Sequence, residues 1–250
     1  MHRFANPGRF LRLAAVVQPW TAGVTLILLA AGVYFGLIAS PADYQQGNTV
    51  RIMYVHVPAA WLAMAAYSTI ASASAVALIW KHPLADLVAK AASPVGASFA
   101  FLCLITGSLW GKPMWGTWWV WDARLTSMLI LFFLYLGHMA LIDAFDDPTR
   151  GAKAAAILAL AGFVNVPVIK FSVDWWHTLH QPASVSKAGM PSVDPAMLLP
   201  LLLMGVGFTT FFITLLLWRV RAEILAAKVR SLRVTQIHAQ PADAAAEAAA

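Results

Sequence analysis

Six long apolar runs dominate the pattern of hydrophobic and polar positions along the chain. Each run is close to the roughly 20 apolar residues that an α-helix needs to cross a bilayer core. The runs cover residues 20–40, 57–80, 91–110, 125–142, 152–171 and 196–218. None of them alternates between apolar and polar positions as a transmembrane β-strand does. The pattern predicts an all-α polytopic membrane protein with six transmembrane helices.

Composition strengthens this prediction. Of the 250 residues, 60% are hydrophobic and 11% are charged, whereas soluble domains carry about 25% charged residues. We expect a single membrane domain over residues 1–220 and a cytoplasmic tail over 221–250, first basic and then alanine-rich. The first run is longer than the roughly 7–15 residue core of a secretory signal. It is therefore predicted to stay as an uncleaved helix.

The lysines and arginines predict the orientation of the helices. Twelve of the 17 lie in the flanks that share a side with the N-terminus, and five lie in the opposite flanks. Because basic residues are enriched on the cytoplasmic side, both termini are expected in the cytoplasm. The segments expected on the outer side are 41–56, 111–124 and 172–195. The basic part of the tail is expected either to extend the sixth helix or to lie on the anionic membrane surface.

Tryptophan is concentrated in one outer segment. Five of the eleven tryptophans lie within residues 110–121, at Trp110, Trp115, Trp118, Trp119 and Trp121. Helical spacing over 113–122 would place three of these indoles and Asp122 on one face. An interfacial aromatic belt explains one or two tryptophans at a helix end, but not this density. The alternative interpretation is an apolar shelf for a large, flat ligand.

Two charged residues end this tryptophan segment, defined here as residues 110–124. Asp122 precedes the fourth apolar run and is predicted to cap its helix through a backbone N–H. Arg124 is expected either to neutralise a carboxylate of a ligand or to anchor at the lipid headgroups.

Histidines lie on the same outer side. His56 stands at the mouth of the second run, and His177 and His180 lie in the third outer segment. Neutral imidazole is a common metal ligand, and haem iron takes axial ligands along the normal of its ring. Two histidines from different segments are therefore candidates to hold a haem iron from opposite faces. A lone histidine near an interface is more often a hydrogen-bonded structural residue. Cys103, the only cysteine, is expected to be a small buried apolar residue.

Several motifs together resemble a known family. "WGTWWVWDARLTS", "MYVHVPAAW", "FDDP", "NVPVIKFSV" and "WWHTLHQ" occur in order with these helices around them. The sequence resembles the CcmC family of bacterial cytochrome c maturation, within the WWD-domain superfamily of haem-handling proteins. The likeness covers about residues 20–220.

The resemblance implies a function and a set of site residues. Such proteins hold haem b, iron protoporphyrin IX, transiently as cargo at the periplasmic face of the bacterial inner membrane. The residues implied to contact haem are Trp115, Trp118, Trp119, Trp121, Asp122 and Arg124. His56 and His180 match the axial ligands of the family, and His177 does not. No catalytic residue is implied, and the protein is not expected to be an enzyme.

The resemblance also implies partners and a division of labour. The family passes haem to the membrane-anchored haem chaperone CcmE. The ATP-binding-cassette transporter subunits CcmA and CcmB then release the loaded chaperone, assisted by the small membrane protein CcmD. A missing Walker A motif in this chain agrees with that division, and no nucleic-acid partner is expected.

Two other functions stay open from the sequence. One is a transmembrane haem conduit, in which the intramembrane His138 and the proline-interrupted helices form a path. The other is a structural membrane subunit, in which the tryptophan segment docks a partner protein and the histidines are incidental.

Overall fold

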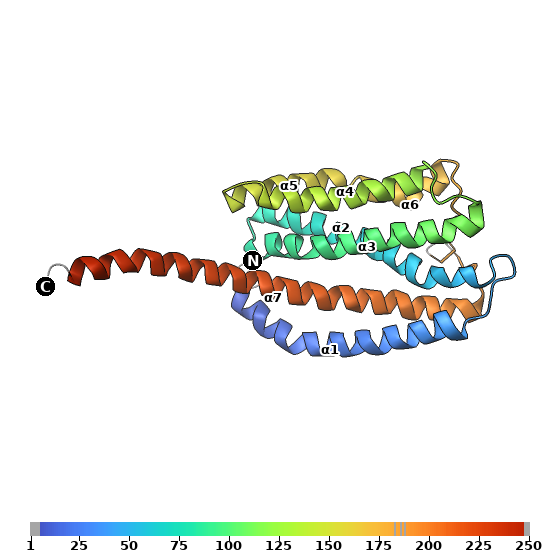
Figure 1. Ribbon diagram of the computed structural model, residues 1–250, viewed down its shortest axis with the longest axis horizontal. Coiled ribbons are helices and arrows are strands. Elements are labelled where there is room, and N and C mark those ends of the chain that lie inside the picture. The colour runs from blue at the N-terminus through green and yellow to red at the C-terminus, as the bar shows by residue number, and fades with distance from the viewer. Residues whose placement is uncertain (1–5, 183, 186, 188, 248–250) are drawn as a thin grey trace.

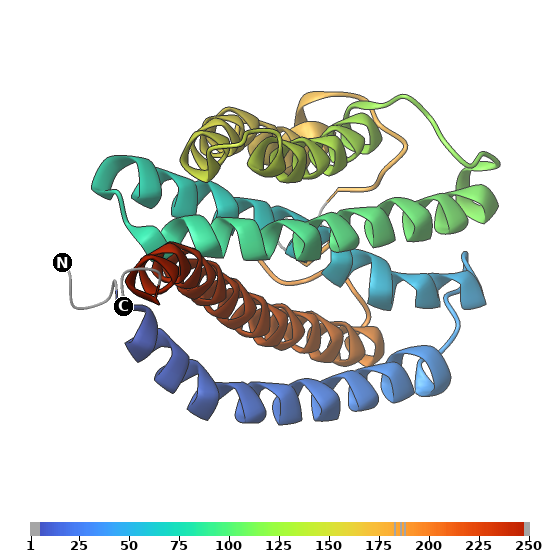
Figure 2. The ribbon, with the colours of Figure 1, turned by 60° about the vertical axis from the view of Figure 1, so that its left-hand side comes forward.

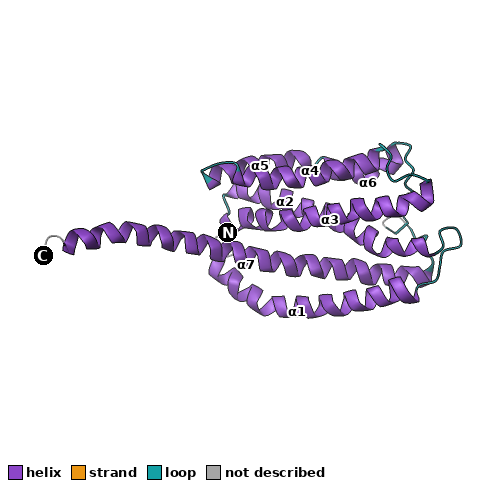
Figure 3. Cartoon of the chain, viewed as in Figure 1, coloured by secondary structure: helices purple, strands orange, loops and turns teal. Residues whose placement is uncertain are grey.

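The computed structural model describes residues 6–182, 184–185, 187 and 189–247, with the side chains of the last helix described to residue 236. The described chain is a bundle of helices joined by loops (Figure 3), and six helical spans are long and apolar enough to cross a membrane. The all-α polytopic prediction is confirmed. The α-helices are α1 Pro7–Val33, α2 Met53–Trp80, α3 Pro83–Trp115, α4 Ala123–Asp143, α5 Pro148–Gly162, α6 Asn165–Trp175 and α7 Pro195–Glu247; a π-helix, Tyr34–Ala39, prolongs α1, and a 3-10 helix, Asn48–Ile52, leads into α2.

The helices are longer than the apolar runs because local capping sets their ends. Asn6 caps α1 with its side chain, which accepts from the N–H of Gly8 at 2.8 Å. At the C-terminal end of α3, Gly116 adopts a left-handed conformation with φ of 75° and ends the helix. A residue without a Cβ is suited to this conformation. The first helical part of the tryptophan segment therefore ends at Trp115. Residues 116–122 form a loop instead of continuing the helix, and α4 begins at Ala123.

Helix α2 lies at the centre of the bundle and packs most extensively on α3 (Figure 1). Small residues let bulky ones approach closely where α4 packs on α3. A Cβ at Gly96 on α3 would lie 2.3 Å from the ring of Tyr135 on α4. The hydroxyl of Tyr135 donates to the carbonyl of Ala63 on α2 at 2.6 Å. This bond satisfies a buried hydroxyl that would otherwise be costly in an apolar interior.

Helices α1 and α7 form a pair along one side of the bundle (Figure 2). The start of α1 and the projecting end of α7 lie at one end of the bundle, as six spans require (Figure 1). At this end the ammonium of Lys90 on α3 lies 3.0 Å from a carboxylate oxygen of Glu223 on α7. Three long irregular segments, 41–47, 116–122 and the described residues of 176–194, gather at the opposite end of the molecule (Figure 1). The tail extends the last helix, one of the two alternatives expected for it.

Candidate functional site

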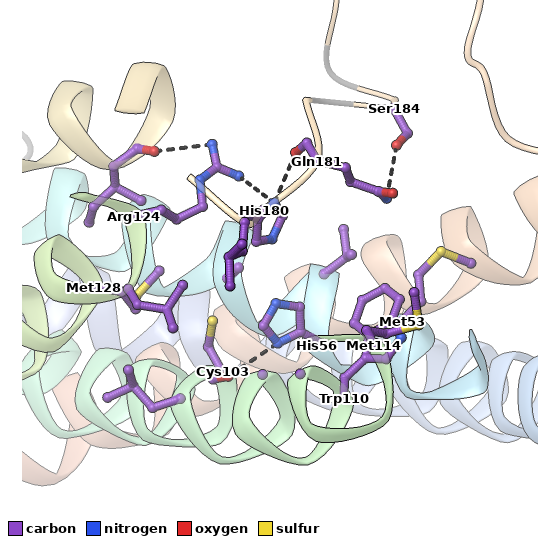
Figure 4. A pocket seen from close by; sticks show the side chains of 18 of the residues that line it. Met53, His56, Cys103, Trp110, Met114, Arg124, Met128, His180, Gln181 and Ser184 are labelled. Atoms are coloured by element: carbon purple, nitrogen blue, oxygen red, sulfur yellow. Dashed lines mark hydrogen bonds between the residues drawn. The ribbon is translucent and has the colours of Figure 1, made fainter. Parts of the chain in front are cut away.

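A hollow opens at the end of the bundle where the three irregular segments gather (Figure 4). Helices α2 and α3 form its floor, and the segment after α6 contributes its roof. His56 and His180 both line the hollow, although they lie 124 positions apart in the sequence. The structure therefore brings together the two histidines that the family resemblance implied.

His56 is held from below by helix α3. Its Nδ1 lies 3.1 Å from the carbonyl oxygen of Cys103 and 3.1 Å from Oγ1 of Thr106. Thr106 donates its own proton to the carbonyl of Leu102 at 2.6 Å. Because a carbonyl oxygen only accepts, the proton of the imidazole lies on Nδ1 and Nε2 keeps its lone pair. Gly107 makes room for this ring, since a Cβ there would lie 2.9 Å from Cε1 of His56.

His180 is oriented by the backbone of its own loop. Its Nδ1 lies 2.9 Å from the carbonyl oxygen of Gln181, so Nδ1 donates and Nε2 is again free to bind. Burial lowers the pKa of His180, the Gln181 carbonyl raises it, and the nearby Arg124 guanidinium lowers it. The net effect favours the neutral imidazole, which is the form that binds a metal ion.

The two imidazole rings face one another across a gap of a defined size. Their centroids are 6.5 Å apart and their planes are inclined by 31°. Two metal–imidazole bonds of about 2.0 Å, with about 1.1 Å from each nitrogen to its ring centre, together span roughly 6.2 Å. The observed separation therefore matches one metal ion held between the rings.

Tryptophans pack against both histidines. Trp110 meets His56 edge to face, with centroids 5.7 Å apart and planes at 76°, and Trp115 lies 6.3 Å from His180. Trp119 also lines the hollow, and its buried Nε1 has no hydrogen-bond partner among the described residues. Trp118 and Trp121 lie outside the lining and are 54% and 78% exposed. The loop that follows Gly116 turns these two indoles away.

Arg124 lines the hollow and Asp122 does not. Oδ1 of Asp122 accepts from the N–H of Leu125 at 2.8 Å, so the predicted cap of α4 is confirmed. Its Oδ2 is buried and has no partner among the described residues. Arg124 lines the hollow and donates to the middle of α6, at the carbonyls of Ile169 (3.2 Å) and Lys170 (3.1 Å). Nη1 of Arg124 also lies 3.4 Å from Nδ1 of His180. This is longer than the 2.9 Å from Nδ1 to the Gln181 carbonyl, so the carbonyl decides the tautomer.

The sequence pattern missed other residues of the hollow. Gln46 lines it and accepts from Nε1 of Trp110 at 2.9 Å, a role that depends on the folding of the loop before α2. Methionines also line it, at Met53, Met64, Met114 and Met128. His177 is exposed and lies outside the lining, because α6 ends at Trp175.

The donor set suits a metal ion that brings its own equatorial ligands. Within the described ranges, no group of three or more His, Cys, Asp or Glu side chains is placed to hold a metal ion. A haem iron needs only two axial ligands from the protein. Two opposed imidazoles, indoles beside each of them and one cation at the edge fit this group. A bare ion would find only two ligands here.

The fold and this site define the protein as a multi-pass membrane protein with a two-histidine hollow, framed by tryptophans, at one end of its bundle. The sequence model of the CcmC family, described as heme exporter protein C, matches residues 1–235. The chain belongs to this family.

Similar proteins come from distant organisms. A protein named heme exporter protein C from Bradyrhizobium diazoefficiens is 60% identical, over 93% of this chain and 88% of its own length. The protein of the same name from Escherichia coli K12 is 46% identical, over 95% and 96%. A Marchantia polymorpha protein named putative cytochrome c biosynthesis ccmC-like mitochondrial protein is 47% identical, over 77% and 80%.

Proposed function

We propose that this protein binds haem b through its iron, with His56 and His180 as the two axial ligands. The observation that carries the proposal is the pair of opposed imidazoles 6.5 Å apart, each with Nδ1 held by a carbonyl oxygen. A hydrogen bond at Nδ1 fixes the tautomer, points Nε2 at the iron and raises the basicity of the ligand. Both ligands are therefore preorganised for one ion.

The surrounding residues hold the porphyrin and select its orientation. The indoles of Trp110, Trp115 and Trp119 offer apolar faces and edges to the macrocycle. Arg124 supplies a cation at the rim, where a haem propionate can accept from its guanidinium. Trp118, Trp121 and Asp122 do not line the hollow as it stands, so they act on haem only through the shape of the loop or after it moves.

The two ligands differ in how firmly the protein holds them, which supports a handover role. His56 is 9% exposed and lies in the first turns of α2, packed against α3. His180 lies in a loop and is half-buried. We propose that haem stays here transiently as cargo, at the periplasmic face of the bacterial inner membrane. On this account His180 leaves the iron first, when the haem chaperone CcmE takes the haem.

The proposed role places the protein in a complex for c-type cytochrome biogenesis. Its partners would be CcmE, the ATP-binding-cassette subunits CcmA and CcmB, and the small membrane protein CcmD. The names of the similar proteins support a role in haem export or transfer. This chain would contribute binding and presentation, with no bond-making chemistry of its own.

The experiment that tests the proposal is a haem titration of the purified full chain in lipid nanodiscs. We expect one haem per chain and the optical spectrum of six-coordinate, low-spin, bis-imidazole iron. Transfer is then followed by adding purified CcmE and watching the spectrum move to the chaperone. A five-coordinate or non-saturating spectrum contradicts the binding site, whereas a stable complex that never yields haem to CcmE contradicts only the handover. Haem supplied inside sealed vesicles, with the site facing out, separates a holder from a conduit.

A further inference from the structure

The last helix continues beyond the bundle and presents a surface that nothing in the described chain covers. Among its described side chains, which reach residue 236, Ile224 is the last buried one, and it packs with Leu84, Ala91 and Val220. Every described residue from 228 to 236 is exposed. The helix runs on along the direction of its membrane span and projects beyond the ends of the other helices (Figure 1).

An apolar stripe follows one face of this extension. Leu225, Val229 and Leu232 are 49%, 47% and 55% exposed. Their spacing of four and three residues places them on one side of a helix, as at alternate core positions of a coiled coil. Exposed aliphatic side chains in water are stabilised when another apolar surface covers them. This stripe has the form of one half of a helix–helix seam.

Cations line both edges of this stripe. Lys228 and Arg233 lie on either side of it by helical geometry, at the flanking positions that choose a partner in coiled coils. Residues 225–236 include no acidic residue, and no hydrogen bond or ion pair of these two cations is present among the described residues. Arg230 and Val234 lie on the opposite face and are also exposed. The stripe and its flanking cations therefore favour a partner helix with an apolar face and acidic flanks.

We propose that the stripe formed by Leu225, Val229 and Leu232 docks an acidic amphipathic helix of a partner protein on the side of the membrane where the chain ends. The bilayer does not fit as the occupant. Helix α7 continues along the direction of its span (Figure 1), so the stripe does not lie along the membrane surface. Each residue advances a helix by about 1.5 Å, so Val229 lies about 15 Å beyond Arg219, the first charged residue after the apolar run 196–218. This exceeds the screening length of about 8 Å in physiological salt. A second copy would oppose Lys228 and Arg233 with the same cations.

The test uses the purified full chain in zwitterionic nanodiscs and a fluorescent synthetic helix with leucine at core positions and glutamate at the flanks. We expect saturable binding, followed by fluorescence anisotropy, that weakens as salt is raised. The variants Val229→Asn and Leu232→Asn, and the double variant Lys228→Glu/Arg233→Glu, each lower the affinity by about tenfold or more. A peptide with lysine at its flanks prefers the double variant, which reverses the charge specificity.

Matched controls lie on the other face of the same helix. Val234→Asn and Arg230→Glu are expected to change the affinity by less than about twofold. Equal losses in these controls, or no binding of the acidic peptide, overturn the proposal. So does tighter binding to anionic vesicles than to the peptide, or a self-dimer that depends on Val229. In cells, a photo-cross-linker on Val229→Cys should form an adduct with another protein that Lys228→Glu/Arg233→Glu removes, and Val234→Cys should not form it.

Discussion

Hydrogen bonds to carbonyl oxygens decide which nitrogen of each histidine is free at the site. Cys103 and Gln181 contribute only their backbone carbonyls to this arrangement. Their side chains are therefore less important here than the positions of the helix and loop that carry them. The indoles add a second set of contacts, because Trp110 packs on His56 and is itself held by Gln46.

Replacing Gln46 tests this indirect support. Gln46→Leu removes the acceptor of the Trp110 N–H, and a net hydrogen bond contributes about 1 kcal/mol. We expect the haem affinity to fall by roughly fivefold, measured by haem titration in nanodiscs. Gln46→Glu keeps an acceptor and should retain most of the affinity. The exposed neighbour gives a matched control: Gln45→Leu should bind as the wild type does, and an equal loss in it would contradict the role of Gln46.

The pH dependence of haem binding tests the charge beside His180. Only the neutral imidazole binds iron, and burial and Arg124 lower the pKa of His180 below the ordinary value of about 6.5. Binding should therefore persist as the pH falls through 6.5, the reference value, and be lost only in more acidic solution. Arg124→Gln removes a cause of the lowering and should move the midpoint upward, whereas Arg124→Lys should not. Identical midpoints for all three proteins would exclude this influence.

Most of the helices could be predicted from the sequence, because a bilayer demands long apolar runs. Their ends could not, since Asn6 and Gly116 set them by local geometry that apolar periodicity does not record. The same limit applies to the site. His56 was predicted because it stands at the mouth of an apolar run, whereas only the family resemblance favoured His180 over His177. The place of Trp118 depends on a turn in the backbone. Gln46 reaches the hollow through a folded loop that carries no signal in the pattern.

Close helix packing predicts a contrast between two glycines. A Cβ at Gly96 would lie 2.3 Å from the Tyr135 ring, whereas a Cβ at Gly23 on α1 meets nothing within 4 Å. Gly96→Ala should lower the free energy of unfolding by about 1–3 kcal/mol through overpacking. Gly23→Ala should leave it unchanged or raise it by up to about 1 kcal/mol, because alanine favours the helix. Thermal unfolding in detergent measures both, and equal stabilities would contradict the packing of α3 against α4.

The whole molecule has two unlike ends. One carries the hollow and its three irregular segments, and the other carries the start of α1 and the projecting end of α7 (Figure 1). The lysines and arginines divide twelve to five between the two sets of flanks. On this basis the hollow is expected on the outer side of the membrane, where a haem chaperone can reach it.

Cysteine labelling in intact cells or spheroplasts tests this orientation. Cys103 is the only native cysteine and is buried, so introduced cysteines report alone. Tyr44→Cys, at a position 90% exposed in the loop before α2, should react with a membrane-impermeant maleimide added outside. Asp146→Cys, exposed between α4 and α5, should react only after the membrane is opened. The reverse result would place the hollow in the cytoplasm.

Axial ligation is tested most directly by rescue with free imidazole. In His56→Gly and His180→Gly, each cavity lacks one ligand, and we expect the low-spin bis-imidazole spectrum of the haem complex to become high-spin. Added imidazole should restore the low-spin spectrum in both variants, while His177→Gly should match the wild type throughout. A low-spin spectrum that persists without imidazole in either His56→Gly or His180→Gly would show that the iron is held elsewhere.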